Sequence, residues 1–330
     1  MGGRPDPRIA RPIVSDIPPA PDALEGERTE ERVLPEGSSA DRLDRAVARL
    51  FGISRGKAMD WIAEDRVRVG GRRAPKGSQV GAGARVSVRL PPSEAPVPQP
   101  ELAIRIVHAD EHIVVADKPA GMPSHPLKPG ETGTAANALV GRFPELARVG
   151  PAPREGGLVH RLDGDTSGLL LAARTDAAHT ALRAQFAART VEKGYLALVA
   201  GELQAGGEIA VPLAHDPQDP RRVRAASDPD WAEAHDARPA LTRFEPRERR
   251  RGFTLVDVEI ATGVMHQIRA HLAFIGHPIA GDDLYGGPRL PELARHFLHA
   301  ARIGFAHPGG GRALFESPLP ADLADVLERL

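Results

Sequence analysis

A proline-rich stretch, PPSEAPVPQPE from Pro91 to Glu101, divides this chain of 330 residues into two unequal parts. Proline fixes its own backbone torsion and has no amide hydrogen, so the stretch is unsuited to a regular helix or a central strand. We therefore expect 91–101 to be a stiff, extended linker. A chain of this length accommodates one large and one small domain, which the linker places at 102–330 and 39–90.

The small segment is basic, although the whole chain has a net charge of -1. Between residues 41 and 90 there are twelve Lys or Arg against five Asp or Glu. Helical spacing of apolar residues predicts a helix from near Asp41, and Ser54 is a typical N-cap for a second helix, Arg55 to Glu64. Alternating valines predict short strands at 67–69 and 86–90. The segment is therefore a small α/β module, behind a proline-rich, acidic stretch at 1–38 that is predicted to be a disordered leader.

The large segment has the pattern of an α+β domain. Apolar runs predict buried strands at 113–116 and 169–173, and alternation predicts strands at 191–199 and 256–260. Helices are expected at 134–143, after Thr175 and at 268–275. Because irregular insertions separate the strands where regular crossover helices would otherwise lie, we expect a mixed, largely antiparallel sheet.

Composition excludes several classes of protein. The chain has no cysteine, which excludes disulfides, thiolate metal sites and cysteine nucleophiles. No apolar stretch has the length of a membrane span and no signal peptide opens the chain, which favours a cytoplasmic protein without a membrane partner. A metal site is not expected either, because His266 and His271 do not share a helix face and no H-E-x-x-H motif occurs.

The segment HRLDGDTSG, His160 to Gly168, is the first candidate for chemistry. It is polar, contains glycine and directly precedes the predicted strand at 169–173. Asp163 is a carboxylate with Arg161 close by. Asp, Thr and Ser are also common turn residues that satisfy backbone donors. Composition alone therefore leaves a structural loop and a reactive carboxylate both open.

This segment matches HRLDxxTSG, the motif of the RluA-type family of pseudouridine synthases, at every defined position, and the chain resembles that family. Further segments follow in the family's order: DKPAGMPSHP at 117–126, KGYLALVAG at 193–201, TGVMHQIRAHL at 262–272, GHPIAGDDLYGG at 276–287, LHA at 298–300 and FESPLP at 315–320. The resemblance covers 102–330 nearly continuously and implies the catalytic domain of that family. The segment from Arg42 to Arg73 is similar to the ribosomal S-four-like (alpha-L) RNA-binding module.

The resemblance also implies roles for individual residues. Asp163 is the expected catalytic carboxylate, Arg269 pairs with it and keeps it ionised, and Tyr195 packs on the target base. Substrate contacts are implied at His160, Arg161, Leu162, Thr166, Ser167, Gly168, His266 and Gln267. RNA contacts of the small module, to which the N-terminus of a helix adds free N–H groups, are implied at Arg42, Arg55, Lys57 and Arg72.

The chain departs from the family at Val264 and Met265, where the family motif has Arg and Thr. The departure concerns RNA affinity or substrate choice more than chemistry, because Asp163, Tyr195 and Arg269 are in place.

The implied reaction is the isomerisation of uridine to pseudouridine in structured RNA, after the target base has been flipped out. Nothing is oxidised, reduced or hydrolysed, so no cofactor is expected. Large-subunit ribosomal RNA is the favoured partner and tRNA the alternative, and no obligate protein partner is predicted. Two other interpretations stay open: a catalytically silent RNA-binding protein, and a nucleoside or glycoside hydrolase that releases free uracil or sugar.

Overall fold

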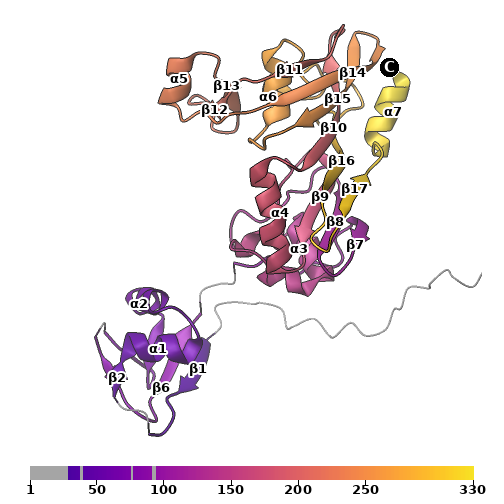
Figure 1. Cartoon of the computed structure of the whole chain (residues 1–330). Coiled ribbons are helices and arrows are strands. Elements are labelled where there is room, and N and C mark those ends of the chain that lie inside the picture. Colours follow the sequence, from indigo (N-terminus) through magenta and orange to yellow (C-terminus); the bar gives the residue numbers. More distant parts are fainter. Residues whose placement is uncertain (1–28, 38–39, 76, 91–93) are drawn as a thin grey trace, which may run out of the picture. The chain divides into compact units, whose positions relative to one another are not determined.

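The structure is a computed structural model that describes residues 29–37, 40–75, 77–90 and 94–330 (Figure 1). The chain forms two compact units, Met1–Pro92 and Ser93–Leu330. Residues 1–28 of the predicted leader lie outside the described residues. None of the helices in the described ranges has the length and apolarity needed to cross a membrane.

A four-stranded antiparallel sheet and two helices make up the first unit. The sheet has the order β1–β6–β3–β4, and a separate short ribbon pairs β2 with β5. Valines from β3 and β6 pack with both helices in one core. The elements are β1 (Thr29–Val33), β2 (Asp41–Arg42), α1 (Leu43–Phe51), α2 (Arg55–Ala63), β3 (Val67–Val69), β4 (Arg72–Arg73), β5 (Gln79–Val80) and β6 (Arg85–Arg89).

Strand β1 corrects the expected extent of the leader. The prediction of disorder over 1–38 is wrong for Thr29–Val33, which pairs with β6 along its whole length. The sequence TEERV is mostly exposed and charged, so it has no apolar alternation that would predict a strand. By contrast, the predicted cap of α2 is confirmed, because the Ser54 hydroxyl accepts from the Lys57 N–H at 3.2 Å.

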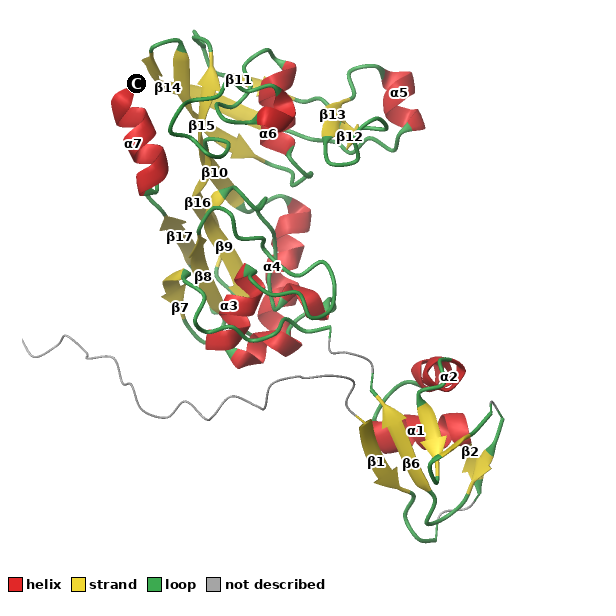
Figure 2. Ribbon diagram, turned by 180° about the vertical axis from the view of Figure 1, so that it is seen from behind, coloured by secondary structure: helices red, strands yellow, loops and turns green. Residues whose placement is uncertain are grey.

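A nine-stranded sheet forms the centre of the second unit (Figures 1 and 2). Its order is β11–β14–β15–β10–β16–β9–β8–β7, and β17 pairs with β16 beside this path. All its pairings are antiparallel except the short parallel contact of β9 with β16, so the predicted mixed, largely antiparallel sheet is confirmed. The strands are β7 (Arg105–Ala109), β8 (Ile113–Lys118), β9 (Ser167–Ala173), β10 (Glu192–Ala200), β11 (Gly207–Ile209), β14 (Thr242–Arg250), β15 (Phe253–Ile260), β16 (Leu298–Ala306) and β17 (Arg312–Glu316).

Helices cover both faces of this sheet. Strands β8 and β9 alternate between two cores: Val114 and Leu170 belong to one and Val115 and Leu171 to the other, which explains their continuous apolar runs. The first core also contains residues of α3 and α6, and the second contains residues of α4. The helices are α3 (Ala135–Arg142), α4 (Asp176–Ala188), α5 (Pro229–Ala234), α6 (Gln267–Phe274) and α7 (Ala321–Arg329), with 3-10 turns at Pro144–Arg148, Pro153–Glu155 and Asp283–Tyr285.

Residues 94–101 have no helix or strand, as the prolines predict, but they are not a free linker. They pack on the second unit: the N–H of Gln99 donates to the carbonyl of Asn137 at 3.0 Å, and the Asn137 amide donates to the carbonyl of Val97 at 2.8 Å. The linker prediction is therefore wrong for this part of 91–101.

A projecting arm, residues 213–235, extends beyond α6 (Figures 1 and 2). It consists of the ribbon β12 (Leu213–His215) and β13 (Val223–Ala225), followed by α5. Trp231 of α5 stacks on His235 with the ring centroids 4.1 Å apart, and the Arg224 guanidinium lies 4.4 Å from the indole centroid. Leu213 and Val223 connect the arm to an apolar cluster that includes Ala270 of α6.

Candidate active site

A pocket of about 460 Å³ lies between the loop that precedes β9 and the start of α6. The structure brings most of the predicted site residues into its lining, from segments as far apart in the chain as 160–166 and 266–269. Those residues are His160, Arg161, Leu162, Asp163, Thr166, Tyr195, His266, Gln267 and Arg269. Ser167 and Gly168 do not line it.

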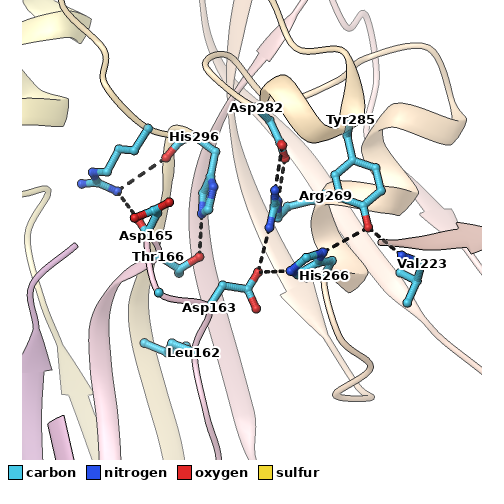
Figure 3. A network of polar contacts seen from close by, with 12 residues as sticks. Leu162, Asp163, Asp165, Thr166, Val223, His266, Arg269, Asp282, Tyr285 and His296 are labelled. Atoms are coloured by element: carbon cyan, nitrogen blue, oxygen red, sulfur yellow. Dashed lines mark hydrogen bonds and ion pairs between the residues drawn. The ribbon is translucent and has the colours of Figure 1, made fainter. Parts of the chain in front are cut away.

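Asp163 is the carboxylate of this pocket and is held by a buried arginine (Figure 3). An Nη1–H of Arg269 donates to Oδ2 of Asp163 at 3.3 Å. Behind it, Asp282 accepts from Nε at 2.7 Å and from Nη2 at 2.8 Å, so it binds the guanidinium through two oxygens. Burial disfavours the charge of Arg269, but the hydrogen bonds and charge of Asp282, together with the charge of Asp163, raise its pKa. The arginine thus stays charged and directed at Asp163.

The loop that carries Asp163 is fixed from behind by two side chains. The Ser124 hydroxyl donates to the Leu162 carbonyl at 2.7 Å and accepts from the Leu162 N–H at 2.9 Å. The Lys118 ammonium is fully buried and donates to the carbonyls of Pro119, Met122 and Gly164, the last at 2.8 Å. Carbonyls on both sides of Asp163 are therefore immobilised by hydrogen bonds.

The end of the motif anchors the loop to β16. The Thr166 hydroxyl is hydrogen-bonded to Nε2 of His296 at 2.8 Å, and the Ser167 hydroxyl to Nδ1 of His299 at 3.0 Å. Gly168 has φ 117°, and a Cβ at this position would lie 2.3 Å from the carbonyl oxygen of Ala300. Only glycine fits here, and its close approach forms the parallel contact of β9 with β16.

Two further predicted substrate-binding residues, His160 and Gln267, also have side-chain hydrogen bonds within the protein. Nε2 of His160 accepts from the Leu171 N–H at 3.0 Å, and partial burial lowers the pKa of this histidine to about 3, so the ring is neutral. The Gln267 amide donates to the Leu241 carbonyl and the Thr242 hydroxyl, and accepts from Thr262. These contacts give both side chains a part in holding the pocket wall.

Tyr195 and Arg161 have free polar ends, in contrast. Tyr195, on β10, is 9% exposed, and its hydroxyl has no hydrogen-bond partner among the described residues. Burial and the charge of Asp163 raise its pKa, which keeps the phenol protonated. Arg161 is exposed at the pocket and has no carboxylate partner in the described ranges. Both groups are available to a ligand.

A second line of contacts leads from Asp163 to the arm (Figure 3). Nε2 of His266 lies 3.7 Å from Oδ2 of Asp163, and its Nδ1 lies 3.2 Å from the hydroxyl of Tyr285. The same hydroxyl accepts from the N–H of Val223, in β13, at 3.0 Å.

Comparisons with known proteins decide the family. Residues 112–274 match the family model described as RNA pseudouridylate synthase, and residues 41–86 match the S4 domain. The chain is 37% identical to "Ribosomal large subunit pseudouridine synthase D" of Xanthomonas campestris pv. campestris, over 91% of this chain and 92% of the relative. It is 42% identical to an "Uncharacterized RNA pseudouridine synthase" of Chloroflexus aurantiacus, over 91% of this chain and 94% of the relative. The chain belongs to the RNA pseudouridine synthase family. Its fold is also similar to "Human RNA Pseudouridylate Synthase Domain Containing 1", with a TM-score of 0.54 and 25% identity over 66% of this chain and 84% of the human one.

As an RNA pseudouridine synthase, the protein is an isomerase that acts on uridine in RNA. Family and fold confirm the resemblance drawn from the motifs, including the S4 domain. Three residues of the site were not among those predicted: Asp282, Tyr285 and Lys118. All three lie in segments that match the family, GHPIAGDDLYGG and DKPAGMPSHP. Their place in these two segments is the sequence feature that could have identified them. Their residue types alone do not distinguish them from other polar residues.

In the S4 domain of this synthase, two of the predicted RNA-binding residues are paired within the protein. Asp44 is 4% exposed and accepts from Nε of Arg42 at 3.0 Å and from Nε of Arg55 at 2.6 Å. These bonds lower the pKa of Asp44 to about 2. Lys57 and Arg72 are exposed, and neither has a carboxylate partner within the described residues. Arg42 and Arg55 therefore have a carboxylate partner, whereas Lys57 and Arg72 have none among the described residues.

Val264 and Met265 have a structural role in this synthase. Both line the pocket and pack on the apolar cluster that includes Leu213 and Val223 of the arm. The departure from the family's Arg-Thr pair thus gives apolar contact between the pocket wall and the arm.

Proposed function

We propose that this synthase converts specific uridines of large-subunit ribosomal RNA to pseudouridine in the cytoplasm, with Asp163 as the catalytic carboxylate. The position of Asp163 carries the proposal: it is the pocket carboxylate that a charged, buried arginine contacts, and Tyr195 lines the same pocket. The substrate class follows from the Xanthomonas relative and from a like-named relative of Pseudomonas aeruginosa, 37% identical over 90% of this chain. Both are named for the large ribosomal subunit.

The geometry supports a division of tasks within the site. Breaking the N-glycosidic bond, turning the uracil and rejoining it through C5 conserves every atom, so the protein has to supply an ionised carboxylate at the ribose and a pocket that retains the free base. A volume of about 460 Å³ is in the range of pockets that enclose small ligands. Arg269 orients Asp163 through its hydrogen bond, Tyr195 packs on the uracil, and Arg161 contacts the RNA strand from which the base has been flipped.

The S4 domain contributes affinity in this proposal. Positive side chains that contact phosphates position a protein on RNA without selecting a base. We assign this role to the 39–90 module through Arg42, Arg55, Lys57 and Arg72, and the catalytic step to 102–330.

Site-by-site mapping of pseudouridine in cells that lack this gene tests the proposal. Complementation with the intact protein is expected to restore one or a few sites in large-subunit ribosomal RNA, and Asp163→Asn is expected to restore none. Asp165→Asn is the matched control, because this exposed carboxylate is two residues away in the same loop. Restoration by Asp163→Asn would remove Asp163 from the catalytic role, and a missing site in tRNA would replace the substrate.

A further inference from the structure

Tyr285 is a buried polar side chain in contact with the pocket residues His266 and Arg269, and the proposed mechanism gives it no task. It lies at the end of the 3-10 turn Asp283–Tyr285 and is 8% exposed. Its ring lies near two guanidinium groups, with 5.1 Å from its centroid to Cζ of Arg269 and 5.4 Å to Cζ of Arg222. Its hydroxyl has two partners, the N–H of Val223 at 3.0 Å and Nδ1 of His266 at 3.2 Å (Figure 3).

The direction of these hydrogen bonds follows from counting protons. The Val223 amide is only a donor, so the Tyr285 oxygen accepts there. The phenol has one proton of its own, and Nδ1 of His266 is its other neighbour within the described residues. Among these neighbours the phenol proton finds an acceptor only if it is donated to Nδ1, which then presents a lone pair. In a neutral imidazole the proton then sits on Nε2.

Nε2 is the nitrogen of His266 that faces Asp163. At 3.7 Å from Oδ2 it is too far for a hydrogen bond, but an N–H dipole at this distance still favours a charged carboxylate. In the opposite tautomer a lone pair would face the carboxylate instead and disfavour its charge. Burial lowers the pKa of His266, against the opposing effect of Asp163, which agrees with a neutral ring.

The backbone of His266 indicates that this arrangement is imposed on the residue. Its φ is 52°, in the left-handed region that histidine rarely adopts, and its side chain does not cap α6. Such a conformation persists where surrounding contacts hold it. The contacts here are Tyr285 on one side of the ring and Asp163 on the other.

We propose that Tyr285 is a positioning residue that fixes the Nε2–H tautomer of His266 toward Asp163, and that the Val223 N–H of the arm holds the Tyr285 hydroxyl in place. The proposal rests on the proposed function in assigning catalysis to Asp163. It makes the arm a structural part of the active site, because β13 supplies the donor that orients the phenol. Loss of the hydroxyl then leaves His266 free to place its proton on either nitrogen.

The first test reads the tautomer directly and needs no turnover. In the full-length protein labelled with ¹⁵N-histidine, long-range ¹H–¹⁵N spectra distinguish protonated from unprotonated ring nitrogens, and His266→Gln identifies the signals. We expect the Nε2–H form in the unmodified protein and a shift toward a mixture of tautomers in Tyr285→Phe, which keeps the ring. His271, buried in the same helix with both nitrogens in hydrogen bonds, is the internal reference. Unchanged His266 signals in Tyr285→Phe would overturn the proposal.

The second test measures turnover on an RNA that the unmodified protein modifies. Tyr285→Phe is expected to lower kcat about tenfold, the effect of one lost hydrogen bond of ordinary strength, with KM within about twofold. His266→Gln keeps an N–H donor near the place of Nε2, so it should retain more activity than His266→Leu. Equal loss in both variants would contradict a donor role. If the unmodified protein were inactive on every RNA, the proposed function would fail while the tautomer measurement still stood.

Discussion

At the scale of single residues, the active site depends on how a buried charge is compensated. Arg269 and Asp282 are 7% and 1% exposed and meet through two hydrogen bonds. The neighbouring Asp283 also pairs with an arginine, Arg289, at 2.6 Å, but this pair is in solvent. Removing one partner of a buried pair leaves an uncompensated charge, whereas an exposed pair is screened by water. Two adjacent aspartates thus offer a comparison of the same chemistry in two environments.

Asp282→Asn is expected to lower the free energy of unfolding by about 3 kcal/mol, because Arg269 loses its charged partner in a buried site. Asp283→Asn is the matched control and should leave the urea midpoint nearly unchanged. Equal midpoints for the two variants would show that Asp282 does not hold the arginine.

His296 predicts a pH dependence of stability. It is 5% exposed, and burial lowers its pKa from 6.5 to about 4. Because the pKa of His296 is lower in the folded protein than its unfolded value of 6.5, the folded state is favoured above pH 6.5. This stability is lost as the pH falls toward 4. The full contribution is on the order of 3 kcal/mol. The stability difference between the unmodified protein and His296→Gln, from urea unfolding, should therefore shrink between pH 7 and pH 5 by about 2 kcal/mol; parallel curves would contradict this.

At the scale of elements, the register of β9 against β16 places the loop that carries Asp163. The two strands meet in parallel only at Ser167–His299 and Gly168–Ala300, directly after the Asp163 loop. Gly168 makes this contact possible because it has no Cβ. Gly164, in the same loop, has open space around the position of a Cβ. One glycine is thus required by packing and the other is not.

Gly168→Ala is expected to cost more than about 2 kcal/mol, since both the backbone torsion and the contact with Ala300 become unfavourable. It should also lower activity, because the loop moves with the strand. Gly164→Ala should keep the thermal midpoint of the unmodified protein. A tolerated Gly168→Ala would show that the strands separate easily at this point.

At the scale of the whole molecule, the proposed function assigns RNA affinity and the catalytic step to different units of the chain. Lys57 and Arg72 carry exposed positive charge in the S4 domain, and Asp163 lies in the other unit. Each lost phosphate contact reduces the slope of log affinity against log salt by about one. Affinity and turnover are therefore expected to respond to different substitutions.

Lys57→Ala combined with Arg72→Ala should weaken RNA binding and reduce the salt dependence by up to about two, while kcat at saturating RNA stays unchanged. Asp163→Asn is the complementary variant, expected to keep affinity and lose turnover. Filter binding at several salt concentrations and single-turnover assays measure the two quantities. An unchanged salt slope would remove these two residues from the phosphate contacts.

Local sequence determines the elements that were predicted correctly. Ser54 and Thr175 cap their helices through backbone groups three residues away, so short-range patterns suffice. Strand β1 has no such pattern, and its partner β6 lies more than 50 residues along the chain. The same distinction holds for the site. A motif resemblance pointed to Asp163 and Arg269, but the contacts of Val223, Tyr285 and His266 with one another exist only in the folded chain.

Lys193, in the pocket wall, is a site at which the protein can be labelled chemically. Burial lowers its pKa to about 8, and its ammonium donates to the Thr262 carbonyl at 2.8 Å. At pH 8 a large fraction of this amine is unprotonated and nucleophilic, whereas exposed lysines remain mostly charged and the fully buried Lys118 is out of reach of reagents. A mild acylating reagent should therefore mark Lys193 early, and bound RNA should protect it. Peptide mass spectrometry of acylated Lys193 then reports whether RNA occupies the pocket, without measuring turnover.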